Sequence, residues 1–119
     1  MSTLKEVRRV FQGLQTLYHT YLPKIDPNLI NDLLTREQKD SKTHPFYLVQ
    51  IFTKEGTDRD FMRNYILEKT EMIPSIYDHG THYVTNHKLS LELLKEFSDL
   101  ENVLKVQGYY TGTLTGVGA

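Results

Sequence analysis

The sequence predicts an α+β fold with one small antiparallel sheet, and two observations lead to this prediction. The first forty residues carry apolar side chains at spacings of three and four, which is the period of amphipathic helices. From Pro45 onward, short runs rich in β-branched and aromatic residues alternate with further helical stretches. The order of these runs indicates a four-stranded sheet with two helices, preceded by a helical hairpin.

The first two elements are helices. Pro23 ends the first helix, and Asp26 followed by Pro27 is the start signal of the second. The apolar stripe of the first helix consists of Leu4, Val7, Phe11, Leu14, Tyr18 and Tyr21, and that of the second of Leu29, Ile30, Leu33 and Leu34. Because the connection is short, we expect an antiparallel helical hairpin over residues 1–40.

After a polar linker the pattern changes to strands and helices in alternation. In chain order we expect a strand at 45–54, a helix at 57–71, a strand at 72–78, a turn at Gly80, a strand at 82–89, a helix capped by Ser90 and a strand at 102–112. Thr57 and Asp60 occupy the capping positions of the helix at 57–71. The side chains of this helix that we expect to be buried are Phe61, Met62, Tyr65 and Ile66. This β-α-β-β-α-β order is the split βαβ arrangement of ferredoxin-like domains. The alternative is a plain βαβαβ sheet in which residues 72–78, with Pro74, form a loop.

The chain length of 119 residues fits one domain. We divide it into an N-terminal helical hairpin (1–40) that packs on the core or on a partner subunit, a ferredoxin-like domain (44–111) and a flexible glycine-rich tail (112–119).

Composition excludes several classes of protein. There is no cysteine, so disulfide frameworks, thiolate zinc sites and cysteine nucleophiles are excluded. A net charge of −1 argues against binding that depends mainly on phosphate contacts. The charged N-terminus does not resemble a signal peptide and no stretch is long and apolar enough for a membrane span, so we expect a cytoplasmic protein that binds no membrane.

The first strand is apolar on both sides. Phe46, Leu48 and Phe52 alternate with Tyr47, Val49 and Ile51, so both faces carry large apolar groups. Strands of this kind are usually central and covered. We therefore expect the N-terminal helices, or a second subunit, to cover the second sheet face.

Three histidines near the predicted hairpin raise the question of a metal site. Imidazoles suit zinc and copper, and the candidate ligands are Asp78, His79 and His82. His87 lies an odd number of residues from His82 and so points to the other face of the strand. With so few ligands on one side, we predict no metal and no cofactor.

The same topology raises the alternative of RNA binding. RNA-recognition motifs place aromatic side chains on the first and third strands, and here "FYLVQI" with Tyr47 has the character of the first-strand motif. In "HGTHYVTN" Gly80, Tyr83 and Val84 fit the third-strand motif, whereas its basic and two of its aromatic positions are occupied by His79, Thr81 and Asn86.

The sequence therefore predicts a small, non-catalytic, oligomeric binding or assembly module that binds a protein or a small ligand. Tyr47, Tyr83 and His82 are its candidate ligand-binding residues. The two alternatives are a single-stranded RNA-binding domain of RRM-like topology and a small enzyme that uses Asp78, His79 and His82. We expect a homo-oligomer, and we do not expect nucleic acid as its partner.

Overall fold

The chain folds as α+β with four helices and one antiparallel sheet, as the sequence predicts. The computed structural model describes residues 2–40 and 44–114. Its elements are α1 (Ser2–Tyr21), α2 (Pro27–Lys39), β1 (His44–Thr53), α3 (Arg59–Thr70), β2 (Ser75–Tyr77), β3 (His82–Lys88), α4 (Leu91–Asp99) and β4 (Val103–Leu114). Residues 115–119 of the predicted tail lie outside the described residues.

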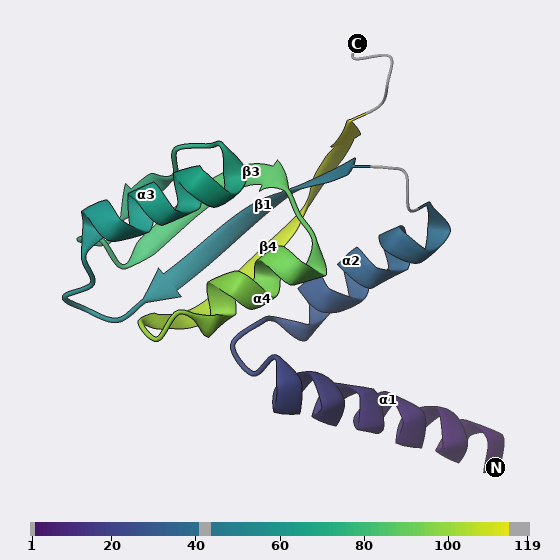
Figure 1. The fold of residues 1–119 in the computed structure, drawn as a ribbon. Coiled ribbons are helices and arrows are strands. Elements are labelled where there is room, and N and C mark those ends of the chain that lie inside the picture. Colours follow the sequence, from purple (N-terminus) through teal and green to yellow (C-terminus); the bar gives the residue numbers. More distant parts are fainter. Residues whose placement is uncertain (1, 41–43, 115–119) are drawn as a thin grey trace.

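The four strands lie in the order β2-β3-β1-β4, and every neighbouring pair is antiparallel (Figure 1). β1 is central and pairs with β3 along one side and β4 along the other. The short strand β2 follows Pro74 and lies at an edge, where a missing backbone N–H is tolerated. This strand removes the alternative in which residues 72–78 are a loop.

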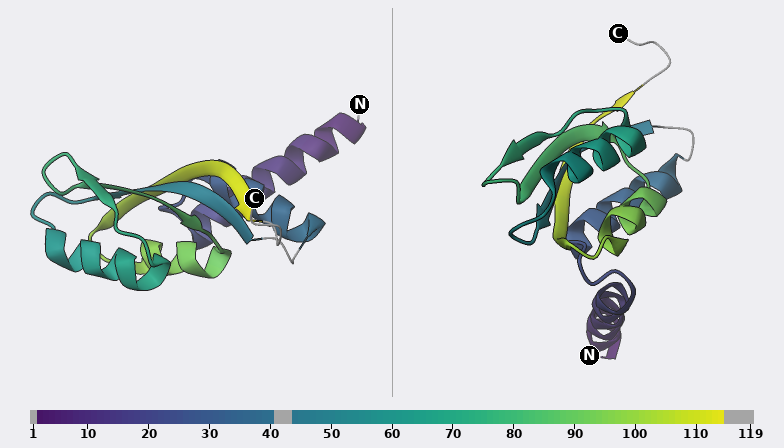
Figure 2. Two further views of the ribbon diagram at one scale, coloured as in Figure 1. Left: turned by 90° about the horizontal axis from the view of Figure 1, so that it is seen from above. Right: turned by 60° about the vertical axis from the view of Figure 1, so that its left-hand side comes forward.

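The helices α2, α3 and α4 all pack on one face of the sheet (Figure 2). Their buried side chains, including Leu29, Met62 and Phe97, meet the odd-numbered positions of β1 and β3. The other sheet face, on which the even-numbered positions of these strands lie, is only half-buried. The expectation that the N-terminal helices cover this second face is therefore wrong for α2.

A cluster of polar and aromatic side chains fixes α2 to the sheet. The Tyr47 hydroxyl donates to Oδ2 of Asp32 at 2.5 Å, and Arg36 Nε donates to the same carboxylate at 3.0 Å. The Arg36 guanidinium lies 3.4 Å from the ring centre of Tyr110, which packs edge-on against Tyr47. Burial and the hydrogen bond to Asp32 raise the pKa of Tyr47 above its ordinary value, so the hydroxyl stays a donor.

The linker between α1 and α2 extends the sheet at the free edge of β4. Asp26 N donates to Val106 O at 2.9 Å, and Val106 N donates to Lys24 O at 2.8 Å. Ile25 is buried between these bonds. Asp26 then caps α2 with Pro27 in its first turn, as predicted.

α1 lies beyond the β4 edge, and its N-terminal end points away from the core (Figures 1 and 2). Its last turn is attached to α2, where the Tyr18 hydroxyl donates to Asn31 Oδ1 at 2.7 Å. Toward the N-terminus its apolar side chains are exposed. The structure thus shows α2 packed on the core and α1 projecting from it.

Three local expectations differ from the structure. The cap of α3 is Asp58 rather than Thr57, and its carboxylate accepts from the amides of Asp60 and Phe61. The Phe61 side chain is exposed, whereas Met62 and Ile66 are buried. β4 continues to Leu114, beyond the predicted strand end.

Candidate interaction surfaces

The first candidate surface is the apolar stripe of α1. Its spacing is three, four, three, four, three, which is the repeat of a coiled-coil seam. The exposed fraction is 56% at Leu4, 62% at Val7, 58% at Phe11, 37% at Leu14, 9% at Tyr18 and 69% at Tyr21. Val10 and Leu17 are also exposed and widen the seam along one side. We call Leu4, Val7, Phe11, Leu14, Tyr18 and Tyr21 the α1 seam.

Charge is distributed unevenly around the α1 seam. The N-terminal half of α1 holds all of its Lys and Arg residues, Lys5, Arg8 and Arg9, and one acidic residue, Glu6. α4 carries three acidic residues and one lysine. A hollow of about 460 Å³ separates the C-terminal end of α1 from α4 and is lined by Tyr21, Leu22, Leu91, Glu92 and Lys95.

The second candidate surface is the half-buried sheet face, which we call the open face. On β1 it carries Phe46, Leu48, Gln50 and Phe52, on β3 His82, Val84, Asn86 and Lys88, and on the edge strands Tyr77, Lys105, Gln107 and Tyr109. The His82 ring stacks on Phe52 at 4.4 Å between centres and packs against Tyr77 at 5.6 Å. Nε2 of His82 donates to Gln50 Oε1 at 2.9 Å, which fixes the ring across two strands.

The open face has no carboxylate on its strands. None of the four strands contains Asp or Glu, so all fifteen acidic residues of the chain lie in helices, connections and ends. The open face carries Lys88 and Lys105. The acidic side chain of Asp78 lies next to it, with Oδ2 3.4 Å from Nδ1 of His82.

The predicted ligand-binding tyrosines lie elsewhere. Tyr47 and Tyr83 are fully buried on the helix-covered face, so they are not placed to stack on a ligand at the open face. The Tyr83 hydroxyl donates to Gly80 O at 2.7 Å and holds the turn between β2 and β3. Of the three predicted residues, only His82 lies on the open face. The aromatic residues there are Phe46, Phe52, Tyr77 and Tyr109.

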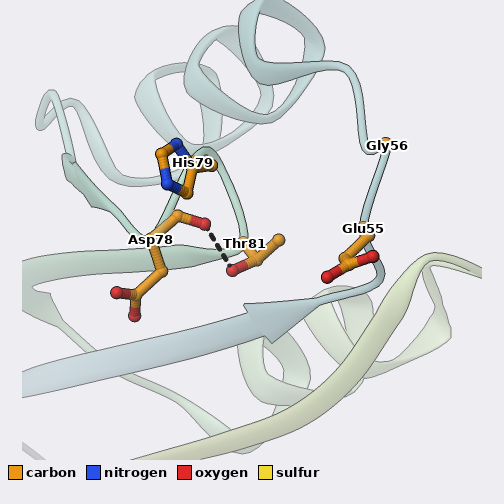
Figure 3. A pocket seen from close by; sticks show the side chains of 5 residues that line it. All are labelled: Glu55, Gly56, Asp78, His79 and Thr81. Carbon is orange, nitrogen blue, oxygen red and sulfur yellow. Dashed lines mark hydrogen bonds between the residues drawn. The ribbon is translucent and has the colours of Figure 1, made fainter.

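The turn between β2 and β3 forms a second hollow, lined by Glu55, Gly56, Asp78, His79 and Thr81 (Figure 3). Asp78, His79 and Gly80 all have positive φ, and Thr81 Oγ1 donates to Asp78 O at 2.8 Å. The carboxylates of Asp78 and Glu55 lie on opposite sides of Thr81. Within residues 2–40 and 44–114, no three His, Cys, Asp or Glu side chains are grouped so that they could hold a metal ion.

One buried histidine belongs to the core. His87 is 1% exposed, and its Nδ1 donates to Lys88 O at 2.7 Å. Neither its Nε2 nor Oγ1 of Thr85 has a hydrogen-bond partner among the described residues. Burial lowers the pKa of His87 and outweighs the hydrogen bond, which raises it.

The sequence of β3 contains a pattern that could have identified the open face, although the residues of that face other than His82 were not predicted. There the even positions are His82, Val84, Asn86 and Lys88, and the odd positions are Tyr83, Thr85 and His87. The even side is the more polar, and pairing with β1 places it beside Phe52, Gln50 and Leu48.

No helix in the described part of the chain is both long enough and apolar enough to cross a membrane. In comparisons with protein-family models, curated proteins and solved structures, the chain shows no significant match.

Proposed function

We propose that this chain is a small non-catalytic assembly module, a ferredoxin-like domain that self-associates through α1. The element order β-α-β-β-α-β and the strand order β2-β3-β1-β4 support the ferredoxin-like assignment. The observation that carries the functional proposal is the α1 seam, which is exposed at every position except Tyr18, on a helix that enters the core only through that residue.

A helix in this position needs a partner. In proteins, most helical stability comes from packing of the amphipathic face rather than from the intrinsic preference of the residues for helix. The α1 seam is a contiguous apolar stripe of the kind that marks a protein interaction site. A second copy of the chain supplies a matching stripe with the same repeat.

The energy available fits a reversible dimer. Covering a side chain that is roughly half exposed gains about 1 kcal/mol. Leu4, Val7, Phe11 and Leu14 of two copies together give about 8 kcal/mol by this measure, and the flanking Val10 and Leu17 add to it. This is comparable with the cost of association, about 4–15 kcal/mol. We therefore expect a dimer that forms with rising concentration.

Light scattering on the purified chain tests the proposal. The parent should move from its monomer mass of 13.9 kDa toward twice that mass as concentration rises. Phe11→Glu should keep the monomer mass, because it places a charge in the seam. Gln12→Glu adds a carboxylate to the exposed polar face one position away and should dimerise like the parent. A parent that stays monomeric at every concentration, or a Phe11→Glu variant that dimerises normally, contradicts the proposal.

The open face favours a second candidate function, the binding of single-stranded RNA. Phe52 stacks on His82, and Tyr77 packs against His82 at a tilt. Lys105 lies opposite Phe52, and the strands carry no acidic residue. Fluorescence polarisation with a labelled single strand tests this idea. Phe52→Ala should weaken binding by about 1–3 kcal/mol, and Phe61→Ala on α3 should not. A parent with no measurable affinity at low salt excludes this candidate.

A further inference from the structure

We propose that the α1 helices of two copies pair antiparallel, so that the basic N-terminal half of each helix lies against the acidic α4 of the other copy. This inference rests on the self-association proposed above and adds the orientation of the pair. Three features of α1 support it: the symmetry of the seam, the position of the charges and the hollow at the end of the helix.

The α1 seam is self-complementary in the antiparallel sense. When Phe11 is placed opposite Leu14 of a second copy, every other seam position also meets a seam position. The register pairs Leu4 with Tyr21 and Phe11 with Leu14, and each pair occurs twice around a two-fold axis. Val7 lies at the level of Tyr18, whose ring is already buried against its own chain, so Val7 meets the edge of that contact. The seam from Leu4 to Tyr21 spans about 26 Å at 1.5 Å per residue, so the two cores lie at opposite ends of the pair.

The charges distinguish the two orientations. In a parallel pair, Lys5, Arg8 and Arg9 of both copies lie at the same level, and like charges at close range repel. In the antiparallel pair these residues are separated by most of the length of the helix. In an antiparallel pair, the positive end of each helix dipole also lies beside the negative end of the other, and the two dipoles attract.

The hollow beside the C-terminal end of α1 receives the partner in the antiparallel register. Leu4 of one copy lies at the level of Tyr21 of the other. In this position Leu4 packs on the apolar lining of the hollow, which Leu22 and Leu91 form. The same register brings the basic residues next to Leu4 close to Glu92 on the rim of the hollow. Lys95 also lines this hollow, and its charge is paired with Asp99 of the same helix. Apolar and charged groups therefore both find complementary partners.

Cysteine cross-linking measures the orientation directly, because the natural chain has no cysteine. Leu4→Cys and Tyr21→Cys are made as separate proteins, since both side chains are exposed. A disulfide requires the two Cα atoms to lie within about 7 Å. We expect mild oxidation to give a disulfide-linked dimer when the two variants are mixed and none when either variant is oxidised alone. The linked peptides should join position 4 to position 21.

A parallel pair gives the opposite pattern, with each variant linking to itself, and this result overturns the inference. A mixture that does not link although light scattering gives a dimer mass overturns it as well. A monomer mass in light scattering instead removes the proposed function. The two failures are therefore distinguishable.

Salt provides a second test on the parent chain. Raising ionic strength from about 0.05 to 0.5 M screens interactions between exposed charges. Attraction between α1 and α4 predicts that the dimer weakens, seen as a fall in dimer fraction at fixed concentration. A dimer that strengthens with salt indicates repulsion between basic helix ends, as in the parallel pair, and contradicts the inference.

Discussion

At the scale of single residues, Tyr83 connects the core to the turn that shapes one end of the open face. Its ring is fully buried, and its hydroxyl bonds to the carbonyl of Gly80, which has φ +85°. Burial raises the pKa of this hydroxyl above its ordinary value, so it remains a donor at neutral pH. The side chain thus contributes both packing and turn geometry.

We expect Tyr83→Ala to lower the free energy of unfolding by about 3–5 kcal/mol, because it removes a large packed ring. Tyr83→Phe keeps the ring and loses one buried hydrogen bond, which costs about 1 kcal/mol. Tyr109→Ala, an exposed tyrosine on the open face, should change stability by less than about 0.5 kcal/mol. Urea denaturation of the three variants measures this order. Equal losses for Tyr83→Ala and Tyr109→Ala contradict the assignment of faces.

His87 predicts a dependence of stability on pH. Its pKa in the folded chain is lowered by burial, while the unfolded chain has the ordinary value of about 6.5. Below that pH the unfolded chain binds a proton that the folded chain does not, so stability falls as the pH drops, by up to about 1.4 kcal/mol per unit. Chemical denaturation between about pH 8 and pH 5 measures how the free energy of unfolding changes with pH. This change should be smaller for His87→Leu than for the parent. His19→Gln, at an exposed position, should keep the parent slope.

Local sequence could not assign the two faces of β1. Tyr47, Val49 and Ile51 differ little in polarity from Phe46, Leu48 and Phe52, so alternation separates the faces without showing which one the helices cover. The more polar even side of β3 resolves the question only once its register with β1 is known. Register is a long-range property, and for this reason the sequence alone leaves Tyr47 and Tyr83 among the candidate ligand-binding residues.

At the scale of elements, the close pairing of β1 and β4 depends on a glycine. A Cβ on Gly108 would collide with the backbone carbonyl of Leu48, whereas a Cβ on Gly112 would meet no atom within 4 Å. Backbone atoms of β1 and β4 cannot move apart without breaking the ladder between them. A side chain at Gly108 must therefore disturb the sheet.

We expect Gly108→Ala to destabilise the chain by about 1–3 kcal/mol, the usual range for overpacking. Gly112→Ala, in the same strand, should be close to neutral or slightly stabilising, because alanine reduces the entropy of the unfolded chain. Thermal melts of the two variants make the comparison. Equal melting temperatures for the two variants would show that the strands can separate at Gly108.

The helices show where sequence patterns stop being informative. Both α1 and α2 carry apolar stripes, and the sequence predicts both helices on that basis, together with the caps at Asp26 and Ser90. Only α2 is covered by this chain. The difference arises in the linker, whose bonds to Val106 fix the start of α2 on the sheet and leave α1 beyond the edge. Nothing in the helix sequences themselves encodes that contact.

At the scale of the whole molecule, charge and apolar surface are separated. Acidic residues lie outside the strands, the Lys and Arg residues of α1 lie in its N-terminal half, and exposed apolar side chains concentrate on the α1 seam. Such a distribution is suited to assembly, because each copy offers a basic, apolar helix and an acidic acceptor surface at α4. In the proposed dimer, assembly through α1 would leave the open face of each copy uncovered.

We propose that α1 is held by a second copy rather than by its own core, and amide hydrogen exchange of α1 tests this proposal. Helical amides without packing exchange quickly, whereas those buried in an interface are protected. In the concentrated parent we expect the amides from Leu4 to Leu17 to be protected, and that protection should disappear on dilution and in Phe11→Glu while the amides of β1 stay protected. Fast exchange of α1 in the concentrated parent, or protection that neither dilution nor Phe11→Glu changes, would contradict the account.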